Sequence, residues 1–88
     1  MKTIFKYHLS ITDTQVIKMP KGADPFTAQF QGDDLCVWAA VETDAELEDR
    51  EFRIFGTGAP LDLAGVFRFL NTVQQGPLVW HIFTKVPV

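Results

Sequence analysis

The chain of 88 residues is long enough for a single domain, residues 1–88, with a net charge of −3 and 47 % apolar residues. This apolar content argues against disorder, and the acidic balance argues against a general nucleic-acid binder, because such domains carry basic surfaces. The single cysteine, Cys36, excludes an internal disulfide and a cysteine-based metal site, and indicates a reducing compartment.

The N-terminal part of the chain alternates apolar and polar residues with the period of a β-strand. Phe5, Tyr7 and Leu9 share one face of the first predicted strand. Residues 14–19 predict a second short strand, which Pro20 ends.

A hairpin is predicted next, because two apolar runs surround the Gly-Asp cluster at 32–34. In its first strand Phe26, Ala28 and Phe30 share one face. Its second strand, residues 35–41, is apolar on both faces, which is typical of a central strand.

The acidic segment 42–51 holds six acidic residues and one arginine, and it lacks an apolar period. It is interpreted as a solvated loop or a single helical turn. Strand alternation resumes at 51–55, and the last two strands are predicted at 66–75 and 77–85.

The predicted fold is therefore all-β: a small antiparallel barrel or sandwich of six to seven strands. The alternative is an α+β fold with one short helix near 61–73, where Leu61, Leu70 and Val73 share a helical stripe that Gly65 interrupts.

The stretch "FGTGAP" at 55–60 raises the question of a phosphate-binding loop. A dinucleotide fingerprint needs a third glycine where Leu61 stands, and a P-loop needs a lysine that is missing between Arg53 and Lys85. The glycine pair instead predicts a sharp turn after a strand, whose backbone N–H groups could also hold an anion.

Two arginines flank this turn and are hypothesised to face one anion-binding pocket, with two surface arginines as the alternative. Trp80 adds stacking area, and His81 is either a pocket residue or a half-buried histidine bonded to the backbone. The candidate ligand-binding set is Arg53, Gly56, Thr57, Gly58, Arg68, Trp80 and His81.

Neither histidine, His8 or His81, has a nucleophile or ligand partner at a recognisable spacing, and Ser10 lies in no elbow motif. The sequence therefore predicts no catalytic residues, no metal site and no cofactor. The longest apolar runs are only a few residues, so no membrane partner is expected either.

Three stretches, "LCVWAAVE", "REFRIFGTGAPL" and "FLNTVQQGPLVWHIF", resemble a family of short proteins encoded by phages and prophages and classed as a domain of unknown function. In these relatives a histidine often follows "GTG", where this chain has Ala59. The resemblance implies a phage accessory protein acting in the host cytoplasm, and it implies no activity.

Small phage proteins without catalytic residues usually bind other molecules. We expect a non-enzymatic counter-defence protein that sequesters a nucleotide-like immune signal, as a homo-oligomer because a deep pocket in so short a chain needs two copies. The alternative is an anti-CRISPR-type or host-enzyme inhibitor that acts by protein–protein contact through the acidic segment or the aromatic strands. A small hydrolase of nucleotide signals would need a partner for one of the histidines.

Overall fold

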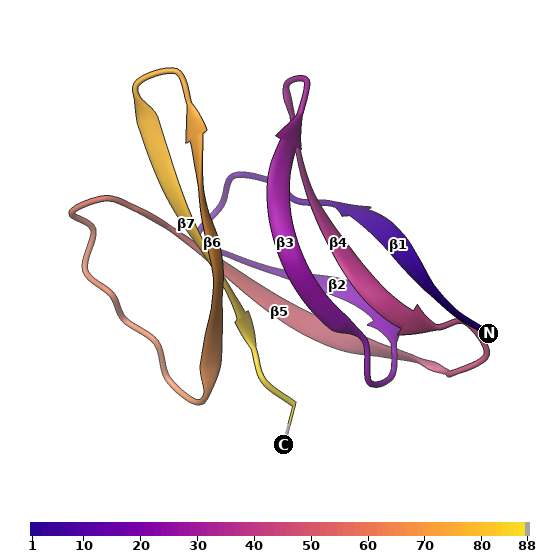
Figure 1. The fold of residues 1–88 in the computed structure, drawn as a ribbon. Coiled ribbons are helices and arrows are strands. Elements are labelled where there is room, and N and C mark those ends of the chain that lie inside the picture. Colours follow the sequence, from indigo (N-terminus) through magenta and orange to yellow (C-terminus); the bar gives the residue numbers. More distant parts are fainter. Residues whose placement is uncertain (88) are drawn as a thin grey trace.

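The computed structural model describes residues 1–87, and in this range seven antiparallel strands form two sheets without any helix. The three-stranded sheet has the order β1-β4-β3, and the four-stranded sheet has the order β2-β5-β7-β6 (Figure 1). The strands are β1 (Lys2–His8), β2 (Thr14–Pro20), β3 (Asp24–Gln31), β4 (Asp34–Glu42), β5 (Leu47–Gly56), β6 (Phe67–Gln75) and β7 (Leu78–Lys85). The all-β prediction is confirmed, and the two separate sheets correspond to a sandwich rather than a barrel.

The core lies between the sheets and follows the alternation of the central strands. In β4, Val37 and Ala39 are fully buried, and Phe52 of β5 and Ile82 of β7 are equally buried in the other sheet. Burial of a side chain as large as Val37, Phe52 or Ile82 stabilises the folded state by about 1.5–3 kcal/mol. The core is completed by Leu9, Met19, Ala23, Ala28, Leu35, Val41, Ile54 and Val73.

The register of β1 on β4 confirms the predicted face of the first strand. Phe5 lies opposite Ala39 and Tyr7 lies opposite Val37, so both share the core face. Tyr7 packs against the core, whereas Phe5 stays 40 % exposed at its margin. The rings of Phe5 and Tyr7 meet edge to face at 6.4 Å, and burial raises the pKa of the Tyr7 hydroxyl.

A β-bulge in each of two edge strands changes the expected faces. In β3 the register shifts between Pro25 and Thr27, which leaves Phe26 exposed rather than on the face of Ala28. In β6 the register shifts between Phe69 and Asn71, which turns Asn71 toward β3. Each of these two edge strands therefore contains one irregular step that exchanges the faces of the residues on either side of it.

Asn71 joins the two sheets where β6 passes β3. Its side-chain amide donates to the carbonyl of Ala28 at 2.5 Å and accepts from the backbone N–H of Ala28 at 2.8 Å. One side chain thus supplies both hydrogen bonds that a neighbouring strand would supply. This contact fixes the distance between the sheets along that edge.

The interpretation of residues 42–51 as a loop or helical turn is wrong over its second half. The turn covers only residues 43–46, and β5 begins at Leu47. The inward-facing positions here are the half-buried Glu48 and the buried Arg50, whereas Leu47 points to solvent. Because charged residues occupy the inner face, an apolar period could not reveal the strand.

The alternative of a helix at 61–73 is also wrong. Residues 57–66 form a loop on the side of the four-stranded sheet away from β3 and β4 (Figure 1). From Phe67 onward the chain pairs with β7, so its backbone groups are bonded across the sheet. Gly65, at φ 100°, adopts a conformation that no regular helix contains.

Trp38 is half-buried on the face of β4 that points away from the core, opposite Lys6 of β1 and Thr27 of β3. Replacing Trp38 with alanine is therefore expected to lower the free energy of unfolding by only about 1–2 kcal/mol. Phe52→Ala, at a fully buried position, is the control and should cost about 3–5 kcal/mol. Urea denaturation measures both, and equal losses would show that Trp38 belongs to the core.

Candidate functional site

The predicted glycine turn closes the end of β5. Ala59 N–H donates to the carbonyl of Gly56 at 3.1 Å, and Gly58 has φ 91°, in the left-handed region that favours glycine. Gly56 has ordinary backbone geometry, but a Cβ atom there would lie 3.4 Å from the Trp80 ring. The bend therefore requires glycine at position 58, whereas position 56 has room for a methyl group against Trp80.

This difference gives a prediction about the turn. Gly58→Ala should lower the free energy of unfolding by about 1–2 kcal/mol, because an L-residue is strained at that φ. Gly56→Ala should stay within about 0.5 kcal/mol of the wild type, because its methyl group makes an ordinary contact with Trp80. Thermal unfolding distinguishes them, and the reverse order would show that the packing contact, not the bend, requires glycine.

His81 lies in the middle of β7, on the outer face of the four-stranded sheet, and both of its ring nitrogens have partners. Nε2 lies 2.8 Å from the Thr57 hydroxyl in the turn, and Nδ1 lies 2.8 Å from the Thr72 hydroxyl on β6. A hydroxyl can donate or accept, so either neutral tautomer satisfies both contacts. The imidazole is therefore held in one orientation by two different elements.

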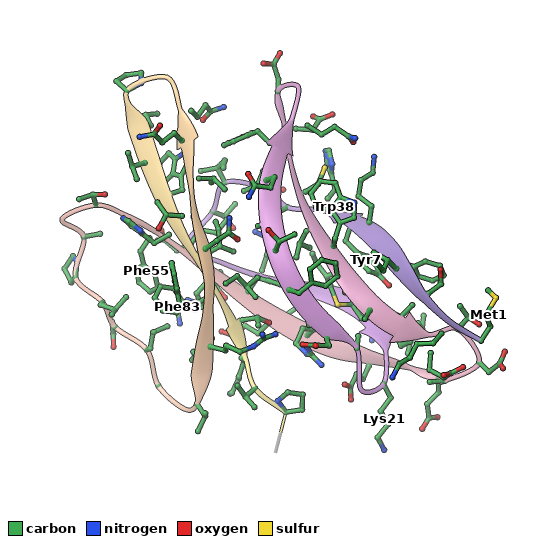
Figure 2. The ribbon with its side chains drawn as sticks, viewed as in Figure 1. Met1, Tyr7, Lys21, Trp38, Phe55 and Phe83 are labelled. Atoms are coloured by element: carbon green, nitrogen blue, oxygen red, sulfur yellow. The ribbon has the colours of Figure 1, made fainter. Side chains whose placement is uncertain are left out.

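Three phenylalanine rings lie beside this histidine on the outer face. Phe55 and Phe83 meet edge to face at 5.8 Å, and Phe69 and Phe83 are tilted at 5.4 Å. Figure 2 shows Phe55 and Phe83 together, toward the loop that follows β5. Large rings thus gather next to the polar contacts of His81.

These groups border a depression of about 280 Å³, which we call the outer hollow. It is lined by the glycine turn at 56–59, Leu61, Phe55, Phe69, His81 and Phe83. Apolar walls with a few oriented polar groups are typical of small-molecule sites, although this hollow lies just below their usual volume of about 300–1,000 Å³.

Arg53 lies beside the outer hollow without lining it. Its guanidinium stacks 5.4 Å from the Phe55 ring centre and 6.0 Å from that of Phe67. It also donates to two backbone carbonyls, at 3.1 Å to Asp13 and 3.3 Å to Asp62. Arg53 therefore anchors the loop 57–66 to β5.

Arg68 lies on the opposite face, so the structure does not bring the two arginines together. It donates to the Asp24 carboxylate at 3.0 Å and to the carbonyl of Pro25, both on β3. The reason is register: Arg53 pairs with Phe83 but Arg68 pairs with Thr84, and consecutive residues of a strand point to opposite faces.

Trp80 lies on the inner face of the four-stranded sheet, opposite to the face of His81, and packs against the core. Five of the seven candidate residues, Gly56, Thr57, Gly58, Trp80 and His81, therefore line hollows around the glycine turn. Arg53 borders this site, and Arg68 lies outside it.

Within residues 1–87, no three histidine, cysteine, aspartate or glutamate side chains gather in an arrangement that could hold a metal ion. In the same range, no helix is long and apolar enough to span a membrane. The chemistry of the site is thus that of aromatic rings, one imidazole and two hydroxyls.

Comparison with known proteins gives one match. A family model described as a domain of unknown function (DUF7352) covers residues 1–88. The chain belongs to this family. No curated protein and no solved structure matches the chain. Because the DUF7352 match spans all seven strands, the outer hollow lies wholly within the family's domain.

Six lining or supporting residues of this DUF7352 domain were not among the sequence candidates: Ala59, Leu61 and the four aromatic or hydrogen-bonding residues Phe55, Phe69, Thr72 and Phe83. The signal for two of them was available, because Phe83 lies two residues after His81 and must share its face. Phe55 directly precedes the glycine turn. Phe69 and Thr72 have opposite parity in sequence, and only the bulge in β6 brings both to the outer face.

Proposed function

We propose that this DUF7352 domain is a non-enzymatic binding module that takes the flat ring of a nucleotide-like small molecule into the outer hollow. The single observation that supports this most is the set of three phenylalanine rings next to a histidine held by two threonine hydroxyls. Aromatic side chains offer a stacking surface to any heterocyclic base. His81 and Thr57 offer donors and acceptors to the edge of such a base.

Binding is favoured over catalysis by the surroundings of His81. Within the described residues its ring nitrogens meet two hydroxyls, and the histidine–carboxylate contact found there joins His8 to Asp34 at 3.6 Å on the other sheet. A general base would be poised by a carboxylate or a comparable orienting group. The arrangement is better suited to recognising a ligand than to activating a nucleophile.

The ring, rather than the phosphate, is the part that the site recognises. The lining of the outer hollow contains no lysine or arginine among the described residues, and Arg53 is engaged by two carbonyls at its margin. A phosphate attached to the ring would extend toward solvent, where the guanidinium of Arg53 provides long-range attraction.

In a host cell infected by a phage, such a module would act by sequestration, lowering the free concentration of a nucleotide-like immune signal. The support for this setting is the resemblance of the chain to phage-encoded proteins. It requires the protein to be present in the host cytoplasm at concentrations above that of the signal, because each site removes one ligand.

A second candidate, an inhibitor that acts by protein–protein contact, is favoured by the rim of the outer hollow. Leu61 and Phe69, which line the hollow, are 63 % and 51 % exposed. Exposed apolar groups next to one another are typical of contact surfaces for host proteins or for a second copy of the chain.

Isothermal titration calorimetry with adenosine, AMP and GMP tests the binding proposal. Phe69→Ala should weaken the binding free energy by about 1–3 kcal/mol, the usual contribution of one stacked base. Phe26→Ala is the matched control, because Phe26 is similarly exposed at 45 % but lies on β3 in the other sheet. Absence of heat with all three compounds, or equal losses in both variants, would contradict the proposal.

A further inference from the structure

Three hollows meet at the glycine turn, and Gly56 lines all of them. The outer hollow lies on the outer face of the sheet. A second hollow of about 190 Å³ is lined by residues 11–13, Ile54, Phe55, Gly56, Ala59 and Trp80, and we call it the Trp80 hollow. A third, of about 400 Å³, is bordered by Gly56, Thr57, residues 77–79 and again Trp80.

The outer hollow and the Trp80 hollow differ in the side of β5 and β7 that they use. His81 points to the outer face, whereas Trp80, the residue before it, points to the inner face. The strand end between them is Gly56, which carries no side chain. Phe55, Gly56 and Ala59 line both hollows, whereas Trp80 belongs only to the Trp80 hollow and Phe69, His81 and Phe83 only to the outer hollow.

Trp80 has an unused hydrogen-bond donor. Its indole Nε1 is buried, and no acceptor contacts it among residues 1–87. Buried donors usually have partners, because an unpaired one destabilises the fold. Nε1 has almost no accessible surface, and the indole edge nearest Gly56 is Cζ3–Cε3, so an acceptor atom of a ligand reaches this donor only if the indole turns.

We infer that the ligand of this domain carries two heterocyclic rings joined by a short linker, as a dinucleotide does. This inference rests on the proposed function, since one ring occupies the outer hollow. The second ring enters the Trp80 hollow, where it stacks on or lies against the indole, and the linker crosses the chain at Gly56. A dinucleotide meets this requirement because its two bases are joined through a flexible sugar–phosphate backbone and each base can stack on an aromatic side chain.

The fluorescence of a Trp38→Phe variant gives a direct readout of the second ring. The chain has two tryptophans, so this variant leaves Trp80 as the only one. Trp38 lies on the other sheet, so its replacement does not alter the Trp80 hollow. The probes are AMP, with one base, and adenylyl-(3′→5′)-adenosine, with two. The two-base probe should bind at least about tenfold more tightly and should change the Trp80 emission, whereas AMP should leave that emission unchanged.

Gly56→Ala supplies the structural test, with Phe69→Ala beside it. Alanine at position 56 places its methyl group 3.4 Å from the Trp80 ring, so it narrows the Trp80 hollow without backbone strain. It should weaken binding of the two-base probe by about tenfold, and by a clearly larger factor than binding of AMP, because its methyl group is directed at the Trp80 ring. Phe69→Ala should weaken both probes.

The outcomes separate the inference from the proposed function. If AMP and the two-base probe bind equally and the Trp80 emission stays constant, the two-ring inference is overturned while single-ring binding stands. If neither probe binds, both fail. If the two-base probe binds more tightly, perturbs Trp80 and is sensitive to Gly56→Ala, the inference is supported.

Discussion

Asn71→Leu is expected to destabilise the protein by about 2–5 kcal/mol. The leucine keeps the approximate volume but removes the amide that bonds to both backbone groups of Ala28. Each of these partly buried groups then lacks its partner, at about 1–3 kcal/mol each. Urea denaturation gives the loss, and hydrogen exchange should show that the amide of Ala28 has lost its protection.

Gln74→Leu is the matched control for this change, because Gln74 is also on β6 but is exposed. It should alter stability by no more than about 0.5 kcal/mol. An Asn71→Leu protein as stable as the Gln74→Leu protein would mean that the side-chain contact between the sheets contributes little. The comparison therefore measures the contact itself rather than a general effect of leucine on β6.

Arg50→Met should destabilise the protein by about 3–5 kcal/mol. Arg50 is 3 % exposed, donates to the carbonyl of Ala23 at 2.9 Å and lies 3.5 Å from the Glu48 carboxylate. Methionine fills much of the same space but leaves Glu48 without its counter-charge and Ala23 without its donor. Glu48 also accepts from Gly22 N–H at 3.3 Å, so the turn between β2 and β3 should loosen as well.

Arg68→Met is the control, since Arg68 is paired with Asp24 but its side chain is 45 % exposed. Exposed ion pairs contribute little, so loss of the pair with Asp24 should lower the free energy of unfolding by about 1 kcal/mol or less. The variant also loses the hydrogen bond to the Pro25 carbonyl. Chemical denaturation of both variants decides the matter. If both variants lose the same free energy of unfolding, the burial of Arg50 does not make its contacts more stabilising than those of the exposed Arg68.

The strand content could be predicted from the sequence because most strands place apolar residues on the core face. In β1 the alternation predicted that Phe5, Tyr7 and Leu9 share one face, and the register agrees. β4 was predicted as a central strand because both of its faces are apolar, so its inner face did not follow from the sequence. The first part of β5 could not be recognised, because Glu48 and Arg50 face inward as an ion pair at 3.5 Å, with Arg50 also donating to a backbone carbonyl. A pattern of apolar residues cannot reveal a strand whose inward-facing side chains are polar and have hydrogen-bond or ion-pair partners.

The candidate site was predictable in part, for a related reason. The glycine turn and His81 followed from the motif "FGTG" and from the alternation in β7. The convergence of Arg53 and Arg68 could not be judged, because it depends on which residues of β5 and β6 lie opposite each other across β7. A shift of one residue in such pairing moves a side chain to the opposite face.

The amide of Asn71 also bears on how the protein behaves at high concentration. β3 is an edge strand, and an edge with free N–H and C=O groups can recruit a strand of another molecule. Near the middle of β3 those groups, on Ala28, are already occupied by a side chain of the same molecule. A strand of another molecule would have to displace the Asn71 side chain before it could pair with β3 at this position. Asn71 is therefore expected to oppose edge-to-edge aggregation of the sheet.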